Sequence, residues 1–271
     1  MMGAKTKIDW CDSTWNPVTG CLHGCEYCYA RRIAERFRAR EIYDPECQCQ
    51  RKLIERGMLK GTGKPLELTY PWEQKNKDGS ITNAAYPFGF APTFHRYKLD
   101  EPQRWKKPRT IFVCSMADLF GDWVPDEWIE QVFEACEAAP QHRYLFLTKN
   151  PKRYVALYRN GILRVRDSFW YGSTITGANE PFFFSRVPDD NPHTFCSIEP
   201  ILEPVGTMQV MPDWVIVGAE TSNRKGKVVP QKEWIDEIAA ECKRRRKPLF
   251  MKDSLRELMG ADFRQELPWD V

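Results

Sequence analysis

The alternation of short apolar runs with helical stretches constrains the fold of this chain more than any other feature of its sequence. The runs are rich in β-branched and aromatic residues, which is typical of buried strands. We expect strands at 13–18, 110–114, 144–147, 169–173, 194–198 and 214–217, and a further one at 248–251. Strands that alternate with helices predict an α/β protein with a parallel sheet and helical crossovers.

The stretches between these runs predict the helices. They are residues 29–42, 125–138, 150–159 and 231–246. Pro125 is typical of a helix start, and Ile235, Ile238 and Cys242 recur at helical spacing in the last stretch. With the strands, they predict a partial (β/α)6-type barrel, a fold in which functional residues lie at the carboxyl ends of the strands.

The chain has 271 residues, a length that suits a single α/β domain over 1–271. Residues 41–107 interrupt the alternation with many prolines and glycines, so we interpret them as an inserted, lid-like segment. No apolar run is long enough to span a bilayer and no apolar leader precedes the first strand, which predicts a cytoplasmic protein without a membrane partner. The net charge of +3 neither demonstrates nor excludes a nucleic-acid partner.

Ten cysteines in a cytoplasmic protein favour metal binding, catalysis or buried thiols over disulfides. Cys21, Cys25 and Cys28 have the spacing C-x3-C-x2-C directly after the first predicted strand. Three thiolates can hold three irons of a [4Fe–4S] cluster and leave the fourth iron open to a small molecule. The alternative is a zinc site with His23, Cys11 or the Cys47 and Cys49 pair as a further ligand.

This cysteine spacing after a first strand resembles the radical S-adenosylmethionine superfamily, as does Tyr27 immediately before Cys28. Four further segments resemble a poorly characterised, radical-SAM-like family of phages and bacteria. They are Thr14-Trp-Asn-Pro-Val-Thr-Gly20, Ser115-Met-Ala-Asp-Leu-Phe120, Ser197-Ile-Glu-Pro200 and Trp214-Val-Ile-Val-Gly-Ala-Glu220. A more distant similarity is to spore photoproduct lyase, a radical enzyme that repairs DNA.

The resemblance implies that Cys21, Cys25 and Cys28 bind a [4Fe–4S] cluster whose open iron binds S-adenosylmethionine. It also implies a place for Tyr27 beside the adenine and an external electron donor such as flavodoxin or ferredoxin. Many members hold the methionyl amino group with Gly-Gly-Glu after the second strand, where this chain has Ser115 and Asp118. Asp118 can take that role or cap the following turn.

Polar residues follow the other predicted strands. Ser173 and Thr174 are candidates to hold ribose hydroxyls or the methionine carboxylate, although hydroxyls are also ordinary at strand ends. Glu199 and Glu220 each end an apolar strand, where a carboxylate needs a partner. That partner is cofactor, substrate or a cation such as Lys149 or Lys252, so a salt bridge is the structural alternative.

We therefore interpret the chain as a radical S-adenosylmethionine enzyme that abstracts hydrogen from its substrate, with Glu199, Glu220 and Lys149 as candidate catalytic residues. The resemblance suggests a nucleobase substrate in phage DNA modification or rearrangement, and leaves isomerase, lyase and transferase reactions open. The alternative function is a non-enzymatic nucleic-acid-binding protein that contains zinc or an iron–sulfur cluster.

Overall fold

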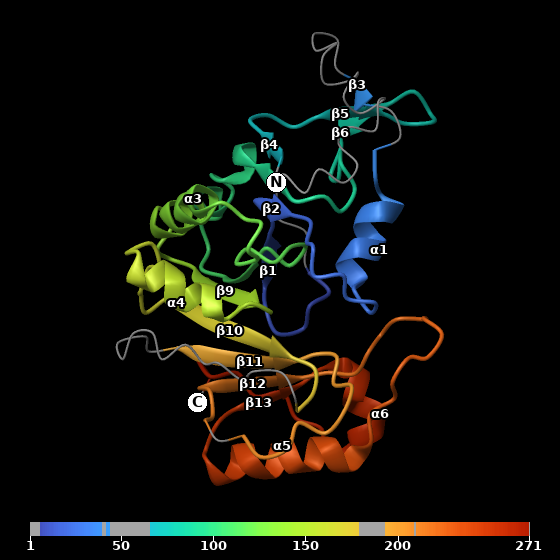
Figure 1. Cartoon of the computed structure of the whole chain (residues 1–271), viewed down its shortest axis with the longest axis vertical. Helices are drawn as coiled ribbons and strands as arrows, with labels where there is room; N and C mark the ends of the chain where they lie inside the picture. The colour runs from blue at the N-terminus through green and yellow to red at the C-terminus, as the bar shows by residue number, and fades with distance from the viewer. Residues whose placement is uncertain (1–5, 40–41, 44–65, 179–192, 209, 271) are drawn as a thin grey trace. The chain divides into compact units, whose positions relative to one another are not determined.

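The computed structural model describes residues 6–39, 42–43, 66–178, 193–208 and 210–270 (Figure 1). The chain divides into two compact units. The first comprises residues 1–14, 107–113 and 140–271, and the second comprises residues 15–106 and 114–139. The first unit contains the main sheet, and the second contains the cysteine motif.

The main sheet has seven parallel strands in the order β1-β8-β9-β10-β11-β12-β13 and curls into a half-barrel (Figure 1). Its strands are β1 (Ser13–Trp15), β8 (Thr110–Val113), β9 (Arg143–Thr148), β10 (Phe169–Ile175), β11 (Thr194–Ile198), β12 (Trp214–Val217) and β13 (Leu249–Met251). The predicted α/β fold and partial barrel are confirmed.

Alternate residues of β10, β11, β12 and β13 build two separate cores. Val215 and Val217 of β12 pack with Ile235 and Ile238 of helix α5 (Lys232–Arg244) on one face of the sheet. Trp214 and Ile216 of β12 pack with aromatic side chains on the opposite face of the sheet. Both faces of the sheet are thus buried, which explains why its strands are continuous apolar runs in the sequence.

The predicted helices all form. They are α1 (Tyr29–Arg36), α3 (Asp126–Glu137), α4 (Lys152–Arg159) and α5. The prediction that the first helix extends to residue 42 is wrong, because the backbone of Arg38 pairs with that of Tyr86. This long-range pairing draws the chain out of the helix. The C-terminal part adds η3 (Asp253–Leu255), the short α6 (Arg256–Met259) and η4 (Gly260–Asp262).

The predicted first strand is divided in two. Asn16 and Pro17 separate β1 from β2 (Val18–Thr19), because proline has no N–H to continue a ladder. β2 leaves the main sheet and pairs with β7 (Thr93–His95) in the second unit. The chain therefore enters the cysteine motif from a small sheet rather than directly from the half-barrel.

The segment predicted as an insertion has its own β-structure. β2, β7 and β4 (Leu66–Leu68) form one sheet, and β3 (Ile42–Tyr43), β5 (Glu73–Lys75) and β6 (Ile81–Asn83) form another. Two 3-10 turns, η1 (Arg96–Lys98) and η2 (Pro102–Arg104), follow. Residues 44–65 lie outside the described residues, and Cys47 and Cys49 are among them. Within the described parts of the chain, no helix combines the length and apolar character needed to cross a membrane.

Candidate functional site

The cysteine motif forms a loop between β2 and α1 in the second unit. Gly20 opens it with a φ of +86°, and a Cβ there would lie 2.3 Å from the carbonyl oxygen of Ala91. Only glycine fits both the backbone conformation and the close approach. Gly24, inside the motif, also has a positive φ, of +74°. Two glycines thus shape the loop that presents the thiols.

Cys28 ends the loop and caps α1. Its Sγ accepts a hydrogen bond from the backbone N–H of Arg31 at 3.4 Å, and its own N–H donates to the carbonyl of Cys25 at 3.2 Å. The N-terminus of a helix carries a partial positive charge, which favours negative charge on a nearby sulfur. The local fold therefore fixes this sulfur at the N-terminus of α1.

Cys21 lies at the other end of the loop and is half-buried. Burial raises the pKa of its thiol to about 12, with the N–H of His23 opposing the rise and Asp118, Cys28 and Cys25 adding to it. The thiols are therefore close enough to influence one another. Without a cation, the Cys21 thiol stays protonated at neutral pH, whereas a coordinated metal displaces that proton.

His23 and Asp118 connect this loop to the turn after β8. Nε2 of His23 lies 2.7 Å from Oδ2 of Asp118, and the imidazole meets the ring of Trp123 edge-on at 4.9 Å. The other carboxylate oxygen, Oδ1, accepts the N–H of Phe120 at 3.0 Å. Asp118 thus caps a turn, as the alternative interpretation expects. A contact of Asp118 with the methionyl amino group stays a prediction.

Ser115 belongs to the same turn. Oδ1 of Asn16 accepts the N–H of Met116 at 2.9 Å and the hydroxyl of Ser115 at 3.2 Å. The hydroxyl of Tyr29 donates to the carbonyl of Ser115 at 2.7 Å. Cys114, just before this turn, has a φ of +58°, a strained conformation for a residue with a Cβ. The turn is therefore held from both β1 and α1.

The described residues of the loop and its surroundings do not form a closed site for a single metal ion. Within the described residues, no three His, Cys, Asp or Glu side chains converge on a point where a metal ion would be held. A single zinc ion needs thiolate sulfurs roughly 3.8 Å apart, given its bond length and tetrahedral geometry. An iron–sulfur cube binds each thiolate to a different iron and so accepts wider spacing. Three thiols on one loop are the type of donor that such a cluster takes.

Glu199 is paired with Lys252 in the first unit. Nζ of Lys252 donates to Oε1 of Glu199 at 2.5 Å, and the two side chains follow β11 and β13. Gly218 lies at the end of β12 between them, where a Cβ would be 2.9 Å from Cδ of Lys252. Glu199 and Lys252 thus meet beyond the ends of β11 and β13, and the partner of Glu199 is one of the two lysines that the salt-bridge alternative names.

Glu220 is almost completely buried, with 3% of its surface exposed. Its Oε1 accepts hydrogen bonds from the hydroxyl of Ser222 and from Nε of Arg224, the latter at 2.8 Å. Burial opposes ionisation, but the hydrogen bonds of Ser222 and Arg224 and the amide of Val228 outweigh it and lower the pKa of this carboxyl. Glu220 is therefore an ionised carboxylate held by its own loop.

The remaining predicted site residues are Ser173 and Thr174 on β10, Lys149 after β9, and Tyr27 in the cysteine loop. β10 extends to Ile175, so Ser173 is not its last residue and Thr174 lies within the strand rather than beyond its end. Neighbouring residues on a strand point to opposite faces, so these two hydroxyls do not face one ligand together. Lys149 directly follows β9 and is half-buried. Tyr27, in the second unit, is also half-buried.

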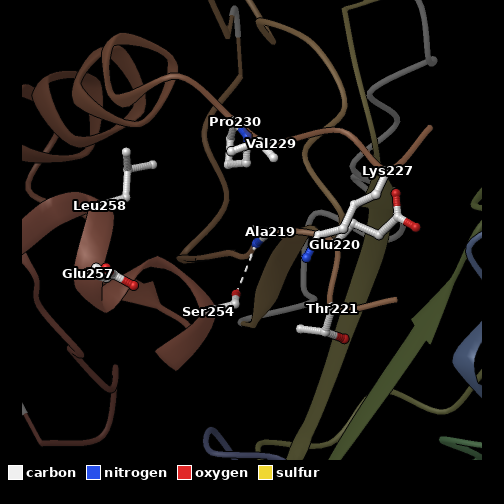
Figure 2. A pocket seen from close by; sticks show the side chains of 9 residues that line it. All are labelled: Ala219, Glu220, Thr221, Lys227, Val229, Pro230, Ser254, Glu257 and Leu258. Atoms are coloured by element: carbon white, nitrogen blue, oxygen red, sulfur yellow. Dashed lines mark hydrogen bonds between the residues drawn. The ribbon is translucent and has the colours of Figure 1, made fainter. Parts of the chain in front are cut away.

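A pocket of about 540 Å³ lies beyond the ends of β12 and β13 (Figure 2). The residues after β12, the residues before α5, and η3 with α6 line it, with Glu220, Lys227 and Glu257 as its charged groups. Oγ of Ser254 accepts the N–H of Ala219 at 3.0 Å and joins two of these segments. Glu220 is the predicted site residue that lines this pocket.

The predicted residues thus form two sets, one in each unit. Cys21, Cys25, Cys28, Tyr27, Ser115 and Asp118 belong to the second unit, and Lys149, Ser173, Thr174, Glu199 and Glu220 belong to the first. Sequence reasoning missed Asn16 and Arg224 as partners of predicted residues. The spacing of four between Glu220 and Arg224 was an available signal, whereas nothing local connected Asn16 to the turn after β8.

Comparison with known proteins gives a family and no function. No curated protein and no solved structure matches the chain. The model of one protein family, described as "Protein of unknown function (DUF5131)", matches residues 5–256. Because this match covers nearly the whole chain, the protein belongs to the DUF5131 family.

Proposed function

We propose that this protein is a radical S-adenosylmethionine enzyme. The single observation that carries the proposal is the loop of Cys21, Cys25 and Cys28, which ends as the N-cap of α1 in a chain that also contains a parallel half-barrel. Cys21, Cys25 and Cys28 would hold a [4Fe–4S] cluster, which would supply the electron for reductive cleavage of S-adenosylmethionine to methionine and a hydrogen-abstracting 5′-deoxyadenosyl radical.

The residues around the loop hold it in place for this role. Gly20 and Gly24 set its path, and Arg31 donates from Nη2 to the carbonyl of Cys21 at 3.5 Å. The positive charge of Arg31 and the N-terminus of α1 both favour the negative charge that three thiolates bring. These contacts support a loop whose own chemistry suits an anionic cluster.

The other assigned roles are proposals that rest on this one. Tyr27, adjacent to Cys28, is proposed to contact the adenine, and the carbonyls held in place around Ser115 are proposed to accept from the methionyl amino group. In the first unit, Glu199, Glu220 and Lys149 are proposed to contact the substrate. A nucleobase substrate stays a prediction from family resemblance.

The proposal is tested by anaerobic reconstitution with iron and sulfide. We expect a brown protein with about four irons per chain. After reduction with dithionite, it should convert S-adenosylmethionine to 5′-deoxyadenosine, measured by liquid chromatography and mass spectrometry. Cys25→Ala should lose both the iron and the product. A colourless wild-type protein that binds a single zinc ion and forms no 5′-deoxyadenosine would refute the proposal.

Cys242→Ala is the matched control. Cys242 is buried in α5 of the first unit, so its replacement removes a thiol without touching the loop. Iron content and 5′-deoxyadenosine formation should stay at wild-type levels in this variant. Full activity in Cys25→Ala would remove Cys25 from the ligand set.

A further inference from the structure

The outer side of α1 exposes large apolar side chains. Tyr29, Ile33 and Phe37 have 44%, 38% and 56% of their surface exposed, and Leu22 of the cysteine loop has 47% exposed. Tyr29, Ile33 and Phe37 are four residues apart along the helix and its cap, so they form one stripe about 12 Å long. We call these four side chains and the neighbouring Arg32 and Arg36 the α1 face.

Tyr29 contributes to the fold through its hydroxyl, which donates to the carbonyl of Ser115, but the helix packs through other residues. Its buried residues are Ala30 and Ala34, which pack against Phe90 and Met116. Single exposed apolar side chains are common on protein surfaces, but several large ones gathered on one surface are unusual. Their concentration on one helix therefore points to an interaction surface.

The charges beside the stripe are positive. Arg32 and Arg36 are exposed, and neither forms an ion pair with any of the described residues. They are one helical turn apart, so they repel each other. The nearby Glu35 does not neutralise them, because its carboxylate accepts the N–H of Phe90 at 3.3 Å and pairs with Arg38. The α1 face therefore attracts an anionic partner.

The side chains of the α1 face favour a protein as that partner. Aromatic residues and arginine are enriched at protein interfaces and supply most of their binding energy. Single-stranded nucleic acid stacks successive bases on neighbouring rings, whereas the aliphatic Ile33 separates the rings of Tyr29 and Phe37 along this face. Apolar side chains flanked by exposed arginines complement a protein with an apolar centre and an acidic rim.

The position of the α1 face beside the cysteine loop indicates the function of the partner protein. Leu22 lies between Cys21 and Cys25, and Tyr29 directly follows Cys28. The proposed function, on which this step rests, consumes one electron for each cleavage of S-adenosylmethionine. The geometry points to the α1 face as the docking site of an acidic one-electron carrier protein. The carrier is oxidised by one electron, the group held by the cysteines is reduced by one, and no atoms move between them.

The test uses the reconstituted full chain and a plant-type ferredoxin with an acidic surface as the probe. The two measurements are its Kd and the ratio of ferredoxin-driven to dithionite-driven 5′-deoxyadenosine formation. Dithionite is small and needs no docking site, so the ratio isolates delivery by the protein. For Arg32→Glu/Arg36→Glu we expect a Kd at least tenfold higher and a ratio at least tenfold lower. The uncharged Ile33→Ser/Phe37→Ser variant should lower the ratio as well.

Lys106→Glu/Lys107→Glu is the matched control, because it makes the same charge change at exposed lysines that precede β8. It should leave the Kd and the ratio at wild-type values. Unchanged values in both α1-face variants would overturn the inference. So would weaker binding of a single-stranded oligonucleotide with unchanged ferredoxin binding. If wild-type protein forms no 5′-deoxyadenosine with dithionite, the proposed function fails and the delivery role fails with it, whereas the Kd still reports docking separately.

Discussion

Nε2 of His23 lies 2.7 Å from Oδ2 of Asp118, and this contact joins the cysteine loop to the turn that follows β8. The carboxylate is buried, and its second oxygen accepts the N–H of Phe120. One side chain therefore fixes both the turn and the middle of the loop. The loop depends on this anchor because the exposed Leu22 and Gly24 on either side of His23 contribute little packing.

Removal of the anchor should weaken the loop. In Asp118→Ala, the N–H of Phe120 loses its acceptor and His23 loses its partner, so we expect metal-free protein to lose about 1–3 kcal/mol of unfolding free energy. Reconstituted protein should also release iron faster to a chelator. Urea unfolding and iron release measure the two effects. Glu134→Gln, on the exposed side of α3, is the control and should change neither. Wild-type iron release in Asp118→Ala would show that the loop holds without this contact.

Cys28 has two separable roles, since it caps α1 and is a proposed metal ligand. Serine is a good helix N-cap but a poor substitute for a thiolate ligand, whereas alanine serves neither role. We expect Cys28→Ser and Cys28→Ala both to lose iron. The metal-free Cys28→Ser protein should be more stable than Cys28→Ala by about 1 kcal/mol in urea unfolding. Equal stability of the two variants would mean that the thiol does not contribute as a cap.

The strands of the half-barrel were predictable because burial on both faces makes them continuous apolar runs. β11 and β12 have the bounds expected from the sequence, Thr194–Ile198 and Trp214–Val217. The end of α1 was not predictable, because Arg38 leaves the helical path to pair with Tyr86, which is distant in the sequence. Local signals identify such elements but not the long-range pairings that end them.

The same distinction explains the candidate site. The cysteine spacing is local and visible in the sequence, and so is the turn-capping capacity of Asp118. Asn16 accepts from Met116 across 100 residues of sequence, so only the fold reveals that contact. β10 continues two residues further than its apolar pattern, since its ladder with β11 extends to the pair Ile175 and Ile198. That extension places Thr174 inside the strand and Ser173 before its last two residues.

The buried Glu220 depends on Arg224, which is a quarter exposed. Arg224→Ala leaves a buried carboxylate without its cation, so we expect a loss of about 2 kcal/mol at pH 7, discounted for the solvent access of the arginine. In the wild type, the hydrogen bonds from Ser222 and Arg224 lower the pKa of Glu220 in the folded protein. They therefore stabilise the folded protein fully above the unfolded-state pKa of 4.5, and this stabilisation is lost as the pH falls below that value. In the variant, burial raises the pKa, and the deficit should shrink as acid protonates the carboxyl.

Urea unfolding of Arg224→Ala between pH 7 and pH 5 measures this deficit. The double variant Glu220→Gln/Arg224→Ala should recover part of the loss at pH 7, because no buried charge remains. Lys225→Ala, an exposed neighbour, is the control and should behave as the wild type. A deficit that stays constant with pH would show that Arg224 stabilises the loop by packing rather than by charge.

His95 should make the stability of the second unit depend on pH. Its ring is fully buried, with Nε2 2.9 Å from Oγ1 of Thr19 and Nδ1 3.2 Å from the hydroxyl of Tyr97. Burial, with a smaller contribution from Lys98, lowers its pKa from 6.5 to about 3. Between these values the unfolded chain binds a proton that the folded chain does not, so stability is full above pH 6.5 and falls as the pH drops towards 3.

The expected loss from this histidine between pH 8 and pH 5 is about 2 kcal/mol. His95→Gln has no titrating ring at this position. Between pH 8 and pH 5 its unfolding free energy should therefore fall by about 2 kcal/mol less than that of the wild type, whatever the stability of the variant at pH 8. Urea unfolding of both proteins at several pH values gives the difference directly, and the other histidines cancel because both proteins contain them. If the two curves run parallel, the imidazole of His95 takes up its proton equally well in the folded chain, and burial does not hold it neutral.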